Sequence, residues 1–188
     1  MTILIQSRRA SLERIQQQHP EAVIFDVTSR GPEPWLRFSP FYPHGNIPVP
    51  FSPGLVSASV EGIWQGLKVF EQADVDTSRF AVTSMKNLKR SVRTYGNVLG
   101  HRQGVNGDQL LSYAEARKTI YLPVYLWVLT NCLQDLLTRL RNQQQTVILL
   151  DYETNCDLSD LTRPLSHAGL IKRYLEEQWP SEVASEKA

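Results

Sequence analysis

The stretch Ser57-Ala-Ser-Val-Glu-Gly-Ile-Trp-Gln-Gly-Leu-Lys-Val-Phe-Glu71 combines a core pattern with a chemical one. Its apolar side chains recur at helical spacing, which predicts a buried stripe of Val60, Ile63, Leu67 and Phe70. A neighbouring stripe holds an acid, an aromatic ring, an amide and a cation at i, i+3, i+4 and i+7, namely Glu61, Trp64, Gln65 and Lys68. These groups are the parts of a nucleotide or sugar site. A plain surface pattern, with the tryptophan in the core, is the alternative.

Further motifs flank this helix along the chain. Arg37-Phe-Ser-Pro-Phe-Tyr-Pro43 precedes it, and Met85-Lys-Asn-Leu-Lys-Arg90 follows it. Later come Tyr113-Ala-Glu-Ala-Arg117, Leu149-Leu-Asp-Tyr-Glu-Thr-Asn-Cys-Asp157 and Pro164-Leu-Ser-His-Ala-Gly-Leu170.

In this order the motifs resemble the NADAR (YbiA-like) family of N-glycosidases, over roughly residues 35 to 175. That family has a helix of the form Pro-Thr-x-Glu-His-x-x-Gln-x-x-Lys, and Glu61, Gln65 and Lys68 keep its spacing. Gly62 stands where the family has histidine, and the Trp-Gly that follows the family's later Asp is missing after Asp157. The resemblance therefore implies a divergent branch.

The resemblance implies a mostly helical α+β fold, with a few short strands in a single compact NADAR-like domain. The chain has 188 residues, of which 41% are hydrophobic, and this suits one folded domain. We expect that domain to cover residues 1–180 and to be followed by a flexible tail, residues 181–188.

The implied activity is hydrolysis of an N-glycosidic bond in a nucleotide, an ADP-ribosyl group or a guanine-like nucleoside. Such cleavage develops positive charge on the sugar, so a carboxylate should face the reacting carbon or activate water. Glu61 is the first candidate and Asp157 the second. His167 is either a proton-transfer group or a neighbour of a helix cap. The side chains expected to bind substrate are Trp64, Gln65, Lys68, Lys86, Lys89, Arg90, Arg117, Asp151 and Asn155.

Two other functions remain open. A base-modifying enzyme, acting on a 7-deazaguanine in DNA, could use Cys156 to attack a nitrile or amidine carbon. Cys156 could equally be a small buried residue. A non-catalytic nucleotide-binding or DNA-binding subunit is the third reading, because the family histidine is absent.

Basic residues are concentrated in one part of the chain. No acidic residue occurs from Arg79 to Asn106, and three glycines loosen the second half of that span. We expect the segment 86–102 to be a mobile basic loop that contacts phosphate or DNA. A solvated helix face with a flexible turn is the alternative.

Three patterns predict the remaining framework. Residues 2–5 and 22–27 read as strands around a helix at 11–18, and residues 146–150 read as a buried strand. Residues 29–56 hold seven of the eleven prolines and should form an irregular loop. A capping box at Ser112 and Glu115 starts a long helix that Pro123 should kink or divide.

Several classes of protein are excluded on composition. No apolar run is long enough to span a membrane, and the first charges follow the apolar residues, which is the reverse of a signal peptide. The two cysteines form no metal motif, and no cofactor-binding glycine motif occurs. The net charge of +1 argues against a protein that coats DNA. We therefore expect a cytoplasmic protein without metal or cofactor, whose oligomeric state stays open.

Overall fold

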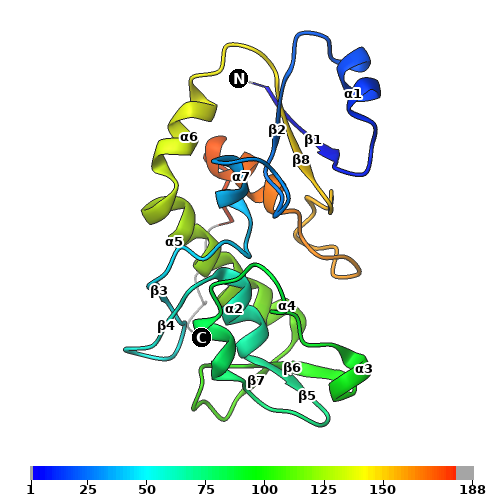
Figure 1. Ribbon diagram of the computed structural model, residues 1–188. Helices are drawn as coiled ribbons and strands as arrows, with labels where there is room; N and C mark the ends of the chain where they lie inside the picture. The colour runs from blue at the N-terminus through cyan, green and yellow to red at the C-terminus, as the bar shows by residue number, and fades with distance from the viewer. Residues whose placement is uncertain (1, 181–188) are drawn as a thin grey trace, which may run out of the picture.

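The first two strands and the last strand of the described residues form a three-stranded parallel sheet, at the top of Figure 1. The fully buried β8 (Val147–Asp151) pairs with β1 (Ile3–Ser7) on one side and with β2 (Val23–Asp26) on the other. The helix α1 (Leu12–Gln18), capped by Ser11, joins β1 to β2. The predicted strands and helix are therefore confirmed. The carboxyl ends of all three strands face the same way, which is where α/β sheets commonly carry functional groups.

The core is built around a long helix made of three consecutive segments. It starts as α4 (Tyr113–Ala116) at the predicted capping box, winds as a π-helix over η3 (Arg117–Tyr121) and continues as α5 (Leu122–Cys132). Pro123 stands just after the π-helical turn, and its ring nitrogen has no hydrogen to donate. The sharp bend comes later, at Leu133, where α6 (Gln134–Arg141) departs at 81°.

The helix that carries Glu61 and Gln65 is shorter than the spacing of its apolar residues predicts. The helix α2 (Val60–Gly66), capped by Ser59, ends at Gly66, and β5 (Lys68–Phe70) follows at once. A Cβ atom at Gly66 would lie 2.3 Å from the ring of Phe80, so the chain there is packed tightly against a neighbouring segment. The expectation that Lys68 shares a helical face with Glu61 is wrong, because pairing of β5 with another strand replaces the next helical turn.

The segment 86–102 is also more regular than expected. It contains the short helix α3 (Val92–Tyr95) and the strand β6 (Val98–Arg102), which pairs with β5 and with β7 (Leu110–Leu111). A mobile loop is therefore the wrong description. Gly96 has a φ angle of 78°, which L side chains rarely adopt, and it ends α3 so that the chain can turn into β6.

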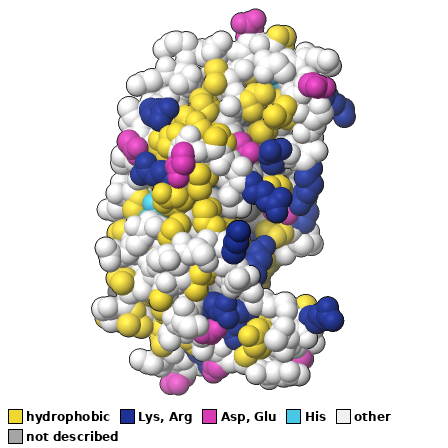
Figure 2. All heavy atoms as spheres, viewed as in Figure 1, with side chains coloured by type: hydrophobic (Ala, Val, Ile, Leu, Met, Phe, Trp, Pro, Cys, Tyr) yellow, Lys and Arg dark blue, Asp and Glu magenta, His cyan; other side chains and the backbone are white. Residues whose placement is uncertain are grey.

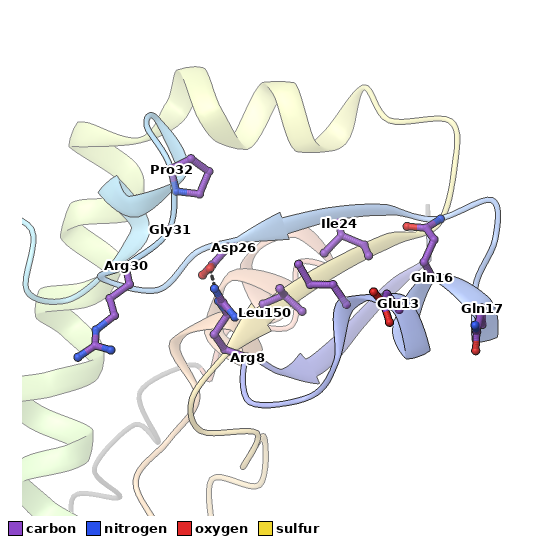
Figure 3. A pocket seen from close by; sticks show the side chains of 11 residues that line it. Arg8, Glu13, Gln16, Gln17, Ile24, Asp26, Arg30, Gly31, Pro32 and Leu150 are labelled. Atoms are coloured by element: carbon purple, nitrogen blue, oxygen red, sulfur yellow. Dashed lines mark hydrogen bonds and ion pairs between the residues drawn. The ribbon is translucent and has the colours of Figure 1, made fainter.

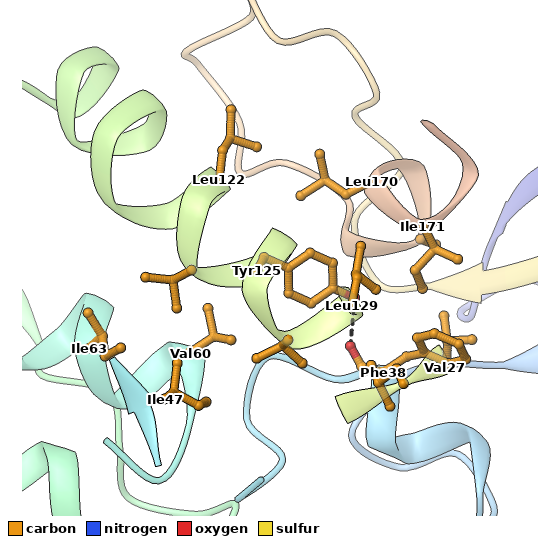
Figure 4. Close-up of a cluster of buried hydrophobic side chains, with 14 of the residues drawn as sticks. Val27, Phe38, Ile47, Val60, Ile63, Leu122, Tyr125, Leu129, Leu170 and Ile171 are labelled. Carbon is orange, nitrogen blue, oxygen red and sulfur yellow. Dashed lines mark hydrogen bonds between the residues drawn. The ribbon is translucent and has the colours of Figure 1, made fainter. Parts of the chain in front are cut away.

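Tyr125 lies at the centre of the hydrophobic core (Figure 4). Its ring is fully buried, and its hydroxyl donates a hydrogen bond to the carbonyl of Phe38 at 2.7 Å. This contact ties α5 to the irregular proline-rich loop, as expected for residues 29–56. The remaining described elements are η1 (Trp35–Phe38), β3 (Ile47–Pro48), β4 (Val56–Ser57), η2 (Thr77–Ala81) and α7 (His167–Leu175).

The computed structural model describes residues 2–180 and confirms an α+β class with a few short strands. The expected tail at 181–188 lies outside the described residues. Within the described range, no single helix is long and apolar enough to cross a membrane. Only the bent pair Tyr113–Cys132 and Gln134–Arg141 reaches that length and composition, when both parts are counted together.

Candidate active site

A cleft of about 740 Å³ separates the carboxyl end of the parallel sheet from α2 and from the antiparallel sheet of β5, β6 and β7. Figure 2 shows Lys and Arg side chains gathered where the right-hand edge of the molecule is hollowed. The structure places seven of the predicted substrate-binding residues in the cleft wall, together with Glu61 and His167. These seven are Trp64, Gln65, Lys68, Lys89, Arg90, Arg117 and Asp151.

Glu61 is a buried carboxyl group in the wall of the cleft. Its side chain is held by the next turn of α2, because Nε2 of Gln65 donates to Oε1 of Glu61 at 2.8 Å. Burial raises the pKa of Glu61, against the opposing effects of the Gln65 hydrogen bond and of the Lys89 and Lys68 charges. A carboxyl group in this setting can hold a proton at a pH at which an exposed one has lost it.

Asp151 is a second carboxyl group of the same cleft, at the end of β8. One oxygen, Oδ2, accepts hydrogen bonds from the Ser166 hydroxyl at 2.8 Å and from the backbone of Ala168 at 3.2 Å, and lies 2.9 Å from Nδ1 of His167. Burial opposes ionisation, but the charge and hydrogen bonds of these partners outweigh it and lower the pKa of Asp151 to about 2.

His167 completes the environment of Asp151. Its other ring nitrogen, Nε2, lies 2.9 Å from the carbonyl oxygen of Val27. Burial would lower the pKa of His167, but the adjacent Asp151 carboxylate and the Val27 carbonyl raise it. Both ring nitrogens therefore face acceptors, which suits a protonated imidazolium. The histidine holds Asp151 and has no free nitrogen for proton transfer to a ligand.

Within this one cleft, the pKa of Glu61 is thus raised and the pKa of Asp151 is lowered. The wall between them includes Tyr121, whose pKa is raised by burial and by the negative charges of Glu61 and Asp151. Tyr121 belongs to the π-helical turn η3, which also supplies Arg117 to the cleft. Such turns are frequent at functional sites, because they shift the side chains that follow them around the helix.

Two lysines supply cations to the cleft without an ion-pair partner among the described residues. Lys68 is half-buried and its Nζ lies 5.9 Å from the Trp64 ring, while Nζ of the exposed Lys89 lies 5.6 Å from the Phe41 ring. Burial lowers the pKa of Lys68, although Glu61 opposes this effect. Cations beside aromatic faces are suited to a ligand that carries both a flat ring and a phosphate.

Arg90 and Arg117 line the cleft, but their guanidinium groups are occupied by the protein itself. Arg90 donates to the backbone carbonyls of Gln65, Lys68 and Asp74. Arg117 donates to the hydroxyl of Tyr113 and to three carbonyls of the loop 158–163. These contacts hold a cleft wall in place, while Nε of Arg90 is buried without a hydrogen-bond partner among the described residues. Phosphate binding by the two arginines stays a prediction.

Four other predicted site residues do not line the cleft. Asp157 is exposed and accepts hydrogen bonds from the backbone and hydroxyl of Ser159 in a local turn. Asn155 is buried and uses its amide to hold the same loop through Asp157, Asp160 and Arg163. Lys86 is exposed, outside the cleft.

Cys156, the fourth, packs against the last helix. A Cβ atom at Gly169 would lie 2.7 Å from Sγ of Cys156, so this thiol is directed toward α7. Burial raises its pKa, which reduces the thiolate fraction needed for attack. The expectation that Cys156 is a nucleophile is therefore corrected, because the structure shows it as a packing residue.

Thirteen lining residues of the cleft were not among the predicted site residues, including Glu153, Phe41, Arg9, Arg30 and Tyr121. Phe41 lies in the proline-rich loop, Arg9 and Arg30 follow β1 and β2, and Tyr121 lies on η3. A signal existed for the two arginines, since each follows the end of a parallel strand. Tyr121 carried no signal, because its direction depends on the π-helical turn.

Gly62 stands where the NADAR helix has histidine, and the packing leaves no space for a side chain there. A Cβ atom would lie 2.7 Å from Oγ of Ser57 and 2.8 Å from the carbonyl oxygen of Arg79. Trp64 faces the cleft instead. Its ring packs on that of His101, with centroids 3.8 Å apart, and burial together with the Lys68 charge lowers the pKa of His101 to about 3. The histidine under Trp64 is therefore neutral.

A larger hollow, of about 940 Å³, lies beside α1 (Figure 3). Its lining includes the apolar side chains Leu12, Ile24 and Leu150, with the ion pair of Arg8 and Asp26 at one side. None of the predicted site residues lines it. The clustered carboxyl groups, cations and aromatic rings are in the smaller cleft, so chemistry rather than volume selects the candidate site.

Comparison with known proteins assigns the family but no activity. The model of a family described as "Family of unknown function (DUF6939)" matches residues 7–171, and the chain belongs to this family. Comparison with curated proteins gave no match, and neither did comparison with solved structures. The resemblance to the NADAR family stays a prediction.

Proposed function

We propose that this member of the DUF6939 family is a hydrolase that cleaves the N-glycosidic bond of a phosphate-bearing nucleotide, an ADP-ribosyl group or a guanine-like nucleoside. The observation that carries the proposal is the pair of carboxyl groups with opposite environments in one cleft. The pKa of Glu61 is raised by burial, whereas that of Asp151 is lowered to about 2. In hydrolytic enzymes, two carboxyl groups whose pKa values lie far apart commonly act as the proton donor and as its ionised partner.

Glu61 is the proton-transfer group in this proposal. In its neutral form it donates a proton to the nitrogen-containing base as the bond from that base to the sugar breaks. Its carboxylate then accepts a proton from the water whose oxygen bonds to the sugar carbon. The products are the free base and a sugar with a new hydroxyl group, and Glu61 ends the cycle protonated as it began.

Asp151 has a different role, because its low pKa makes it a poor base and keeps it ionised. Its charge is partly offset by the His167 imidazolium, but the carboxylate still places a negative oxygen in the cleft, which stabilises the positive charge that develops on the sugar ring. His167, Ser166 and the backbone of Ala168 hold Oδ2, and no hydrogen bond reaches Oδ1 from any residue in the described range. That oxygen is the one available to the sugar. Asp151 thus replaces Asp157 as the second catalytic candidate.

The remaining groups suit a substrate with a phosphate and an aromatic base. Lys68, Lys89 and Arg30 provide cations without an ion-pair partner among the described residues, and Trp64 and Phe41 provide ring faces for stacking. Base modification through Cys156 has no supporting geometry. A non-catalytic nucleotide-binding subunit would use the same cations and rings without the carboxyl pair.

Mass spectrometry of the products tests the proposal. Purified protein is incubated with nucleoside monophosphates, with ADP-ribosylated guanine nucleotides and with oligonucleotides that contain a nitrile-bearing 7-deazaguanine. Release of a free base, with one water added to the sugar fragment, supports the hydrolase. A base that gains the mass of water but stays attached to its sugar supports base modification. Binding without any change of mass supports the non-catalytic subunit.

A further inference from the structure

Gln65 contacts two fixed groups, and together they determine the orientation of its amide. The backbone N–H of Arg90 donates to Oε1 of Gln65 at 3.1 Å, and Nε2 of Gln65 donates to Oε1 of Glu61 at 2.8 Å. A backbone N–H can only donate, so the amide oxygen must face Arg90. The NH₂ group of Gln65 must then face the carboxyl group.

This orientation determines where a proton on Glu61 can reside. Oε1 of Glu61 receives an N–H group, and in a neutral carboxyl group the carbonyl oxygen is a better acceptor than the hydroxyl oxygen, so this contact favours the proton on Oε2. Oε2 receives no hydrogen bond from any residue between 2 and 180. Glu61 lines the cleft, so Oε2 is the oxygen through which it can serve a ligand.

The anchor of Gln65 is itself rigid. Besides its backbone contact with Gln65, Arg90 donates from its guanidinium group to the carbonyls of Lys68 at 2.6 Å and Asp74 at 2.8 Å. The guanidinium carbon lies 4.8 Å from the ring centre of Phe70 and 5.1 Å from that of Tyr95. The orientation of Gln65 therefore depends on the packing of Arg90 against β5 and α3.

We infer that Gln65 is a positioning residue, which occupies Oε1 of Glu61 and directs the acidic proton to Oε2, toward the substrate. The inference rests on the proposed hydrolase function. It replaces the expectation that Gln65 binds substrate directly, since both ends of its amide are used within the protein.

Titration of Glu61 by carbon NMR in glutamate-labelled protein tests the inference without any substrate. The signal of Glu61 is the one that disappears in Glu61→Gln. In Gln65→Met, which keeps the length but removes the donor, the Glu61 midpoint should move to higher pH. The hydrogen bond that favours the carboxylate is lost, while burial and the charged or titratable neighbours Lys68, Lys89 and Tyr121 remain.

Gln65→Glu is the second variant, in case Gln65→Met does not fold. It keeps an acceptor for Arg90 but replaces the donor with a second carboxylate, so Glu61 should titrate still higher and coupled to Glu at 65. An unchanged Glu61 midpoint in a folded variant would overturn the inference.

Hydrolysis supplies an independent measurement. We expect kcat of Gln65→Met to fall by about tenfold or more with little change in KM, because a misplaced acid lowers the rate and leaves substrate binding intact. A raised KM with unchanged kcat would make Gln65 a substrate ligand and overturn its positioning role. If the native protein releases no base from any substrate, the hydrolase proposal fails, while the titration still decides the role of Gln65.

Discussion

At the residue scale, Glu61 is the side chain on which the proposed chemistry depends most directly. Replacement of Glu61 by Gln keeps the shape but removes the exchangeable proton. We expect the rate of base release to fall by at least about two orders of magnitude, the range for a positioned acid or base. KM should change little. Cys156→Ser is the control and should retain native turnover, since this thiol packs against α7. Native turnover in Glu61→Gln would contradict the assignment.

The pair of Asp151 and His167 makes stability depend on pH in both directions. The pKa of Asp151 falls from its ordinary 3.8 to about 2, so its contribution is present above about pH 4 and lost as pH falls toward 2. The pKa of His167 is raised above 6.5, so its contribution is present below about pH 6.5 and lost as pH rises through the raised value. Stability should therefore be greatest between these limits, with about 2 kcal/mol from Asp151.

Urea unfolding between pH 2 and 9 measures this dependence. Glu61, whose pKa is raised, adds a loss of stability as pH rises above its ordinary value of 4.5, so the native protein is compared with His167→Gln. The difference in unfolding free energy between the two should shrink as pH rises above about 6.5. A difference that stays constant from pH 5 to 9 would show that folding leaves the pKa of His167 unchanged, and one that grows with pH would show that His167 is neutral in the folded protein.

At the scale of elements, the packing of α7 against the loop that follows β8 explains why Cys156 is excluded from the cleft. Gly169→Ala would place a Cβ atom 2.7 Å from Sγ of Cys156 and 3.4 Å from its Cβ. We expect a loss of about 1–3 kcal/mol in unfolding free energy, the usual cost of overpacking. In a Cys156→Ala background the same substitution should cost much less, since the sulfur is gone. Equal losses in both backgrounds would place the thiol elsewhere.

At the scale of the whole molecule, basic side chains border one edge of the cleft although the net charge is only +1. If the substrate is part of a nucleic acid, Lys89→Ala should remove one phosphate contact. The slope of log affinity against log salt would then decrease by about 0.9 for duplex DNA or about 0.7 for a single strand. Lys118→Ala, an exposed lysine outside the cleft, is the matched control and should leave the slope unchanged. Equal slopes for the native protein and Lys89→Ala would exclude this contact.

The sequence by itself determined the local parts of this protein. Short apolar runs located the three strands of the parallel sheet, and the capping box located the start of the long helix. The spacing of Glu61 and Gln65 predicted that they share a helical face, because residues four apart are neighbours in any α-helix. These features depend on contacts within a few residues, which a single sequence displays directly.

Only the tertiary structure decided which groups meet. Pairing of β5 with β6 put Lys68 on a strand, and central placement of β8 brought Asp151 to the cleft while Asp157 turned to solvent. Arg9, Arg30 and Tyr121 join Glu61 through contacts between segments far apart in the chain. Periodicity records which side chains share a face of one element. It does not record which faces pack together, since that depends on burying the whole core at once.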